Sequence, residues 1–236
     1  MLHLNTVSPT LLNLIQTVSG RAELTGFRLV GGTALSLYLG HRISVDANFF
    51  TDRSFDKRSV EQTLLTAFPR IRKIQEAAYG FTWVYQDIKL DFYDWKVPFL
   101  QPSTEESGMR LASLADVAAY KLDAIVGRKT EKDFRDVAQL LQSFSLPEMM
   151  GFYAAKFPYN DSRIVLDHLV LTNRVGQDAE LVILKKKPWP DVVSEINQAL
   201  QSYFEQLHQK KQAEVLAREQ RLSELISRKN NPPAGT

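Results

Sequence analysis

Residues 27–51 read FRLVGGTALSLYLGHRISVDANFFT. The apolar run Phe27–Val30 predicts a short strand that leads directly into the pair Gly31-Gly32, and residues 34–39 favour a short helix stopped by the next glycine. Glycine lets backbone N–H groups approach a phosphate because no Cβ intervenes, and the start of the following helix adds a partial positive charge. The pattern is that of a phosphate-binding turn, and equally that of an ordinary tight turn between strand and helix.

Two further segments supply acidic and amide side chains. We expect a strand over Ser44–Phe50, in which Asp46 and Asn48 share one face because strand side chains alternate. A later strand, residues 88–93, places Asp91 on its polar face. Oxygen ligands from neighbouring strands suit Mg²⁺, which can also bind a triphosphate. Taken singly, each acid is equally explained as a surface charge.

A lysine interrupts the apolar stripe of the helix expected over residues 114–126. Lys121 lies four residues from both Val117 and Ile125. Its amine either reaches water along its own stem or meets an anion such as a triphosphate. In the next helix Asp133 and Asp136 lie one turn apart, where they either orient Lys121 or a nucleotide ribose, or simply charge the helix start.

Composition excludes several classes of protein. The chain has 236 residues, 44% hydrophobic and 24% charged, with a net charge of +2, so it can bury a core without disulfides or a structural metal. Zero cysteines exclude a disulfide framework, a zinc ribbon and a thiol nucleophile. We find no apolar run of about 20 residues, no signal peptide, no dinucleotide-binding fingerprint and no serine-hydrolase elbow. We therefore expect a cytoplasmic protein without a membrane partner.

The chain changes character near residue 108. Before it, strands and helices mix; after the loop 98–108 almost everything favours helix. We predict an α+β core over residues 1–108, a helical domain over 109–205, and a charged helix with a disordered tail over 206–236. Three basic clusters are candidates for RNA contact or solvated surface: Arg70, Arg72 and Lys73; Arg128, Lys129 and Lys132; and Lys185–Lys187.

The chain resembles the AbiEii/AbiGii family of nucleotidyltransferases, the toxins of abortive-infection and related type IV toxin–antitoxin pairs. The resemblance rests, in order, on residues 29–35, 39–42, 44–51, 90–92, 111–114, 121–122 and 132–136. It implies a polymerase-β-like nucleotidyltransferase core, a mixed sheet with flanking helices, followed by a helical part that closes over the nucleotide. It also implies a bacterial protein that transfers NMP from an NTP to an acceptor such as tRNA. A cognate antitoxin would be its protein partner.

The resemblance also implies roles for particular residues. Nucleotide-binding residues would be Gly31, Gly32, Thr33, Lys121, Lys132, Asp133 and Asp136; the metal, Mg²⁺ or Mn²⁺, would be held by Asp46, Asn48 and Asp91; and catalysis would rest on Asp46, Asn48, Asp91 and Lys121.

Asn48 departs from the family pattern, which has a second aspartate at that position. An amide offers a metal one neutral oxygen and removes a full negative charge. The change belongs either to a natural lineage with weakened or lost activity or to a chain altered to silence a toxic enzyme. The second hypothesis for function is therefore a non-catalytic nucleotide-binding or protein-interaction module.

Overall fold

A mixed seven-stranded sheet forms the centre of the computed structural model, which describes residues 1–172, 175 and 181–230. The strand order is β3-β4-β5-β2-β1-β7-β6. The strands are β1 (Arg28–Val30), β2 (Ala47–Thr51), β3 (Arg72–Ala77), β4 (Gly80–Tyr85), β5 (Ile88–Asp94), β6 (Thr104–Glu106) and β7 (Met109–Leu111). In the middle of the sheet, β2 runs parallel to β5 and antiparallel to β1.

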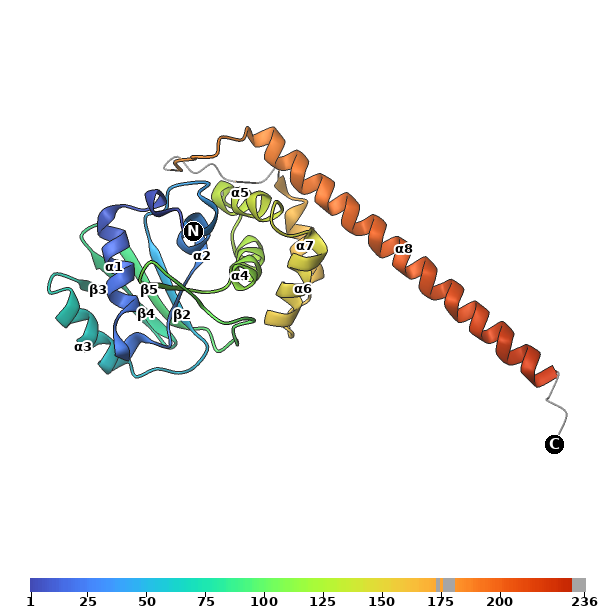
Figure 1. The fold of residues 1–236 in the computed structure, drawn as a ribbon, viewed down its shortest axis with the longest axis horizontal. Helices are drawn as coiled ribbons and strands as arrows, with labels where there is room; N and C mark the ends of the chain where they lie inside the picture. Colours follow the sequence, from blue (N-terminus) through green and yellow to red (C-terminus); the bar gives the residue numbers. More distant parts are fainter. Residues whose placement is uncertain (173–174, 176–180, 231–236) are drawn as a thin grey trace.

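Helices flank the sheet, which confirms the predicted α+β class. They are α1 (Pro9–Ser19), α2 (Gly31–Leu39), α3 (Lys57–Ala67), α4 (Leu114–Gly127), α5 (Glu131–Leu140), α6 (Leu146–Lys156), α7 (Arg163–Leu169) and α8 (Trp189–Asn230), with short 3-10 turns at Leu4–Thr6 and Ala22–Leu24. Figure 1 shows α1 and α3 beside the sheet at one end of the body, with α4 to α7 grouped at the other. No helix within the described ranges is long and apolar enough to span a bilayer.

Two of the expected boundaries in the first 51 residues are wrong. The helix expected from Ala34 begins at Gly31, so the glycine pair forms its first turn and not a separate loop. The strand expected from Ser44 begins at Ala47, so Asp46 lies just before β2 and not within it. Alternation still applies inside β2, where Ala47 and Phe49 are buried and Asn48 faces the other way.

The segment 98–108, expected to be a loop, contributes a strand to the sheet. β6 and β7 form an antiparallel hairpin, and β7 runs parallel to β1 through the pair Leu29 and Leu111. Ser107 and Gly108, at its turn, both have positive φ. The change of character near residue 108 therefore falls inside a hairpin of the sheet, and the division of the chain into domains stays a prediction.

Aromatic residues buried on one face of the sheet determine which polar residues lie on its other face. Phe49 and Phe92 stack at 5.1 Å between ring centroids, and Phe27 meets Phe92 edge-on at 5.4 Å. Because β2 and β5 are in parallel register, the residues just before Phe49 and Phe92, which are Asn48 and Asp91, are also paired. Burying the aromatic residues thus places this amide and this carboxylate side by side on the other face.

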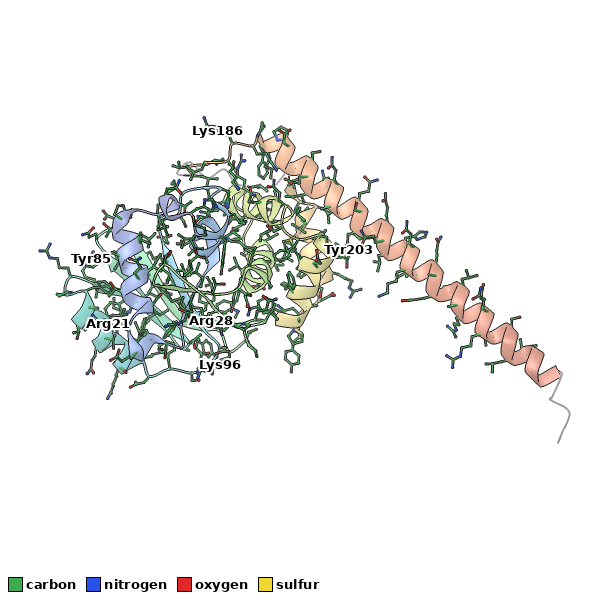
Figure 2. The ribbon with its side chains drawn as sticks, viewed as in Figure 1. Arg21, Arg28, Tyr85, Lys96, Lys186 and Tyr203 are labelled. Atoms are coloured by element: carbon green, nitrogen blue, oxygen red, sulfur yellow. The ribbon has the colours of Figure 1, made fainter. Side chains whose placement is uncertain are left out.

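The C-terminal helix α8 attaches through its first turns only. Val192, Ile196 and Leu200 are buried, and α8 contacts α5 and α6. Figure 1 shows the remainder projecting from the body, and Figure 2 places Tyr203 where the helix passes the α6 and α7 region. From residue 204 to 226 every described side chain is exposed. The predicted helix over residues 206–230 is confirmed, and the tail 231–236, expected to be disordered, lies outside the described residues.

Candidate active site

A cavity of about 490 Å³ lies between the sheet and helix α4. Its wall is built from the end of β1, the first turn of α2, β2, β5 and one face of α4. It brings together eight of the residues singled out in the sequence: Gly31, Gly32, Thr33, Asp46, Asn48, Asp91, Lys121 and Lys132. The other two, Asp133 and Asp136, do not line it.

The glycine pair is required by close contacts in the wall. Gly31 has φ +70°, and a Cβ added there would lie 3.1 Å from Nδ2 of Asn48. A Cβ on Gly32 would lie only 2.1 Å from a guanidinium nitrogen of Arg42. The N-cap residue of α2 is Val30, which makes no side-chain cap. The first turn of α2 therefore presents backbone N–H groups to the cavity without a capping side chain, and Arg42 lies beside it. This arrangement suits the binding of an anion.

Thr33 has a positioning role. Its hydroxyl shares a 2.7 Å hydrogen bond with the Ser44 hydroxyl and donates to the backbone carbonyl of Asp46. The side chain is 1% exposed. These bonds tie the segment before β2 to α2 and so fix where Asp46 lies in the wall.

The sheet side of the cavity carries negative charge. Asp91 accepts a 2.6 Å hydrogen bond from Thr82 at Oδ1 and a 2.9 Å bond from the Lys89 ammonium at Oδ2. Asn48 is its register neighbour, and Asp46 is half-buried nearby in the wall. Within the described ranges, no group of three or more His, Cys, Asp or Glu residues could hold a metal ion. By donor type, two carboxylates and one amide are the oxygen ligands that a hard cation prefers.

The helical side carries positive charge. Lys121 is only 3% exposed and lies 2.6 Å from Asp136 and 3.2 Å from Asp133. Its amine therefore does not reach water along its stem; it meets anions supplied by α5. Asp136 also accepts bonds of 2.8 and 2.9 Å from Arg42, and Asp133 accepts bonds of 2.8 and 3.1 Å from Arg128.

These side chains leave a net positive charge toward the cavity. Lys121, Arg42 and Arg128, all in the wall, share the two carboxylates of α5. Burial alone raises the pKa of Asp136, but Lys121 and Arg42 outweigh it and hold that pKa well below its usual value. The pKa of Asp133 is lowered in the same way against the opposing effect of burial, by Lys121 and Arg128. Both carboxylates are thus charged, and both contact Lys121 and fix its position. Their predicted role in nucleotide binding stays a prediction.

An aromatic group forms another part of the wall, which the sequence analysis missed. Phe50 and Trp95 stack at 5.1 Å with 4° between their planes, and Tyr120 meets Phe50 edge-on at 5.3 Å. Burial raises the pKa of Tyr120, whose hydroxyl has no hydrogen-bond partner in the described part of the chain. Burial also raises the pKa of Asp123, another residue of the wall. The sequence did offer one sign of this group, since Tyr120 directly precedes Lys121, which was already a candidate site residue.

Two charged residues of the wall were also missed as site residues. Arg42 lies 94 residues from its partner Asp136, so sequence proximity gives no sign of the pair. Lys89 was visible, since it lies two residues from Asp91 on the same face of its strand.

The basic clusters differ in their surroundings. From the second cluster, Arg128 and Lys132 line the cavity. In the first, Lys73 of the outer strand β3 is paired with Glu76 of the same strand and with Glu61 of α3. Figure 2 places Lys186, of the third cluster, beside the start of α8. Of the three clusters, the second is the one whose side chains line the cavity together with Asp46 and Asp91.

Comparison with known proteins adds the family. Residues 18–207 match the model of the nucleotidyl transferase AbiEii toxin of type IV toxin–antitoxin systems. The chain belongs to the AbiEii family. It is thus a nucleotidyltransferase, and nucleotidyltransferases of this kind generally use divalent metals. An uncharacterized protein of Aquifex aeolicus is 30% identical to this AbiEii chain over 150 residues, which is 61% of this chain and 72% of that protein.

Solved structures share the fold. JHP933 from Helicobacter pylori matches with a TM-score of 0.53 at 17% identity, over 91% of this chain and 99% of that one. MenT4, a nucleotidyltransferase toxin from Mycobacterium tuberculosis, matches with a TM-score of 0.54 at 11% identity, over 80% of this chain and 82% of its own. At such identities the likeness concerns the nucleotidyltransferase fold, which the AbiEii chain builds with its mixed sheet and flanking helices.

Proposed function

We propose that this AbiEii chain binds an NTP in the cavity and transfers its nucleoside monophosphate to an RNA hydroxyl, with tRNA as the acceptor. The observation that carries the proposal is the facing pair of walls: Asp46, Asn48 and Asp91 on the sheet side, and Arg42, Lys121 and Arg128 on the helical side. A triphosphate with its cation needs both signs of charge at close range, and one cavity provides them.

In this proposal the chain's own residues divide the work. The first turn of α2, with Arg42 and Lys121, binds the triphosphate, and Asp46, Asn48 and Asp91 hold a divalent cation. When bound, that cation would supply Lewis-acid activation of the acceptor hydroxyl and neutralise the leaving pyrophosphate. The acceptor oxygen bonds to the α-phosphorus, the bond from the α-phosphorus to the bridging oxygen breaks, pyrophosphate leaves, and the hydroxyl proton passes to solvent.

The aromatic group gives the nucleobase a surface on which to stack. Trp95 is 40% exposed and is held flat by Phe50 behind it. Aromatic rings accept every base, because each base has a π face. Asp123 in the same wall offers carboxylate oxygens to its edge.

The acceptor reaches the cavity beside Arg128, Lys129 and Lys132. Phosphate contacts by these side chains would make RNA binding fall steeply with salt, because released counterions drive it. RNA affinity that does not change with salt would contradict this placement. As the toxin of a pair, the chain would also have a cognate antitoxin as a protein partner.

Asn48 gives the cation site one negative charge fewer than the aspartate of the family pattern. We therefore expect weak transfer by this chain. The second candidate function, a non-catalytic nucleotide-binding or protein-interaction module, is favoured by that same residue and by the exposed length of α8. The intact glycine turn and buried Lys121 favour the enzyme.

Label transfer tests the proposal. Each of the four α-labelled NTPs is incubated with Mg²⁺, total cellular RNA, and either this protein or its Asn48→Asp variant. Label in RNA from the variant alone identifies a silenced transferase, and label from both shows that the amide is tolerated. If neither labels RNA while thermal stability rises with Mg²⁺ and an NTP, the binding-module function replaces the transferase.

A further inference from the structure

Asp91 already has a cation beside it. The Lys89 ammonium lies 2.9 Å from Oδ2, while Thr82 holds Oδ1 at 2.6 Å and so fixes the carboxylate with its other oxygen toward the lysine. Lys89 and Asp91 are two residues apart on β5 and share the face that lines the cavity. The lysine side chain is 48% exposed, against 13% for Asp91. The ammonium of Lys89 is therefore held at the carboxylate, while about half of the side chain is exposed along the cavity wall.

On the neighbouring strand β2, a negative charge that the family pattern would place beside Asp91 is absent. Asn48 is the register partner of Asp91 and contributes no charge. With Asp46 and Asp91 at −1 each and Lys89 at +1, these four side chains sum to −1. An aspartate at position 48 and a neutral residue at 89 would sum to −3. The site thus attracts divalent cations less, and repels a triphosphate less, than a wall of three free carboxylates.

We propose that Lys89 acts as a built-in cation in the nucleotide site, so that the triphosphate can bind here without a divalent metal. The inference rests on the proposed function, because it concerns the same ligand in the same cavity. On arrival of the triphosphate, the half-exposed Lys89 side chain turns its ammonium from Oδ2 of Asp91 to a phosphate oxygen. Asp91 is then free to bind the divalent cation of the transfer step. Lys89 is a binding residue in this scheme, and Asn48 is the change that makes it sufficient.

Calorimetric titration with each of the four NTPs, in EDTA and in Mg²⁺, tests the inference. We expect the unaltered protein to bind an NTP in EDTA, and Lys89→Met to weaken that binding about tenfold, the effect of one lost charge-assisted hydrogen bond. Lys73→Met is the matched control. Lys73 is also a strand lysine paired with carboxylates, but it lies outside the cavity, so its loss leaves the affinity unchanged.

A second variant tests the role of Asn48. Asn48→Asp adds a negative charge beside Asp91, so it should weaken NTP binding in EDTA and strengthen binding of Mg²⁺ alone. Binding in Mg²⁺ that vanishes in EDTA, or binding in EDTA that Lys89→Met leaves intact, would overturn the inference and leave the proposed function standing. An absence of NTP binding in Mg²⁺ as well would overturn both.

Discussion

Replacing Asp136 with asparagine should destabilise the protein severely although its shape hardly changes. The carboxylate is fully buried and accepts from His41, Arg42 and Lys121, at 2.6 Å from the histidine and the lysine. Asparagine keeps the volume but removes the charge, so two buried cations lose a counterion. Breaking one side of a buried ion pair costs about 3–5 kcal/mol. For a chain of this length each kcal/mol lowers Tm by roughly 2–4 °C, so we expect a fall of roughly 6–20 °C.

Urea and thermal unfolding measure the effect. Asp161→Asn is the matched control, because Asp161 also pairs with an arginine, Arg163, but both side chains are more than half exposed. Exposed pairs contribute about 0–1 kcal/mol, so this variant should unfold close to the unaltered protein. Equal, small effects for the two variants would refute the reasoning, since they would mean that the cations around Asp136 find water or another anion at little cost.

Three further predictions follow from the same contacts. The lowered pKa of Asp136 contributes stability that is present above about pH 4, the unfolded value, and is lost as pH falls below it; the Asp136→Asn variant should therefore show a shallower loss of unfolding free energy on acid titration. Gly32→Ala would place a Cβ 2.1 Å from Arg42 and should cost about 1–3 kcal/mol in urea unfolding, whereas Gly151→Ala, with open space around it, should be neutral or stabilising. Trp95→Ala should weaken NTP binding about tenfold or more in calorimetric titration with little change in Tm, because the indole is partly exposed and offers a stacking surface; an unchanged affinity would place the base elsewhere.

The parts of the site that the sequence predicted are those set by local rules. Alternation along a strand places Asn48 and Asp91 opposite the buried Phe49 and Phe92, and the structure agrees. A lysine inside an apolar stripe either reaches water along its stem or meets an anion, and Lys121 meets two carboxylates. In both cases the side-chain period of one element is enough to give the direction of the residue.

The parts that the sequence did not predict depend on contacts between distant segments. Arg42 fits against Gly32 because Asp136, 94 residues away, fixes its guanidinium, and neither partner predicts the other. The strand β7 holds only three residues and gains its place by pairing with β1. A run that short has too little periodicity to predict a strand. The start of β2 was placed too early because Asp46 and Ser44 also alternate, although Thr33 ties that segment to α2 instead.

The buried aspartates of α5 connect stability with nucleotide binding. Asp133 and Asp136 do not line the cavity, yet they set the position of Lys121, Arg42 and Arg128, which do. Losing either carboxylate should thus lower both Tm and NTP affinity, whereas losing Lys89 should lower affinity alone. A residue that contacts the ligand and a residue that positions it can therefore be separated by comparing the two measurements. Activity alone does not separate them, because in either case the cavity loses a correctly placed cation.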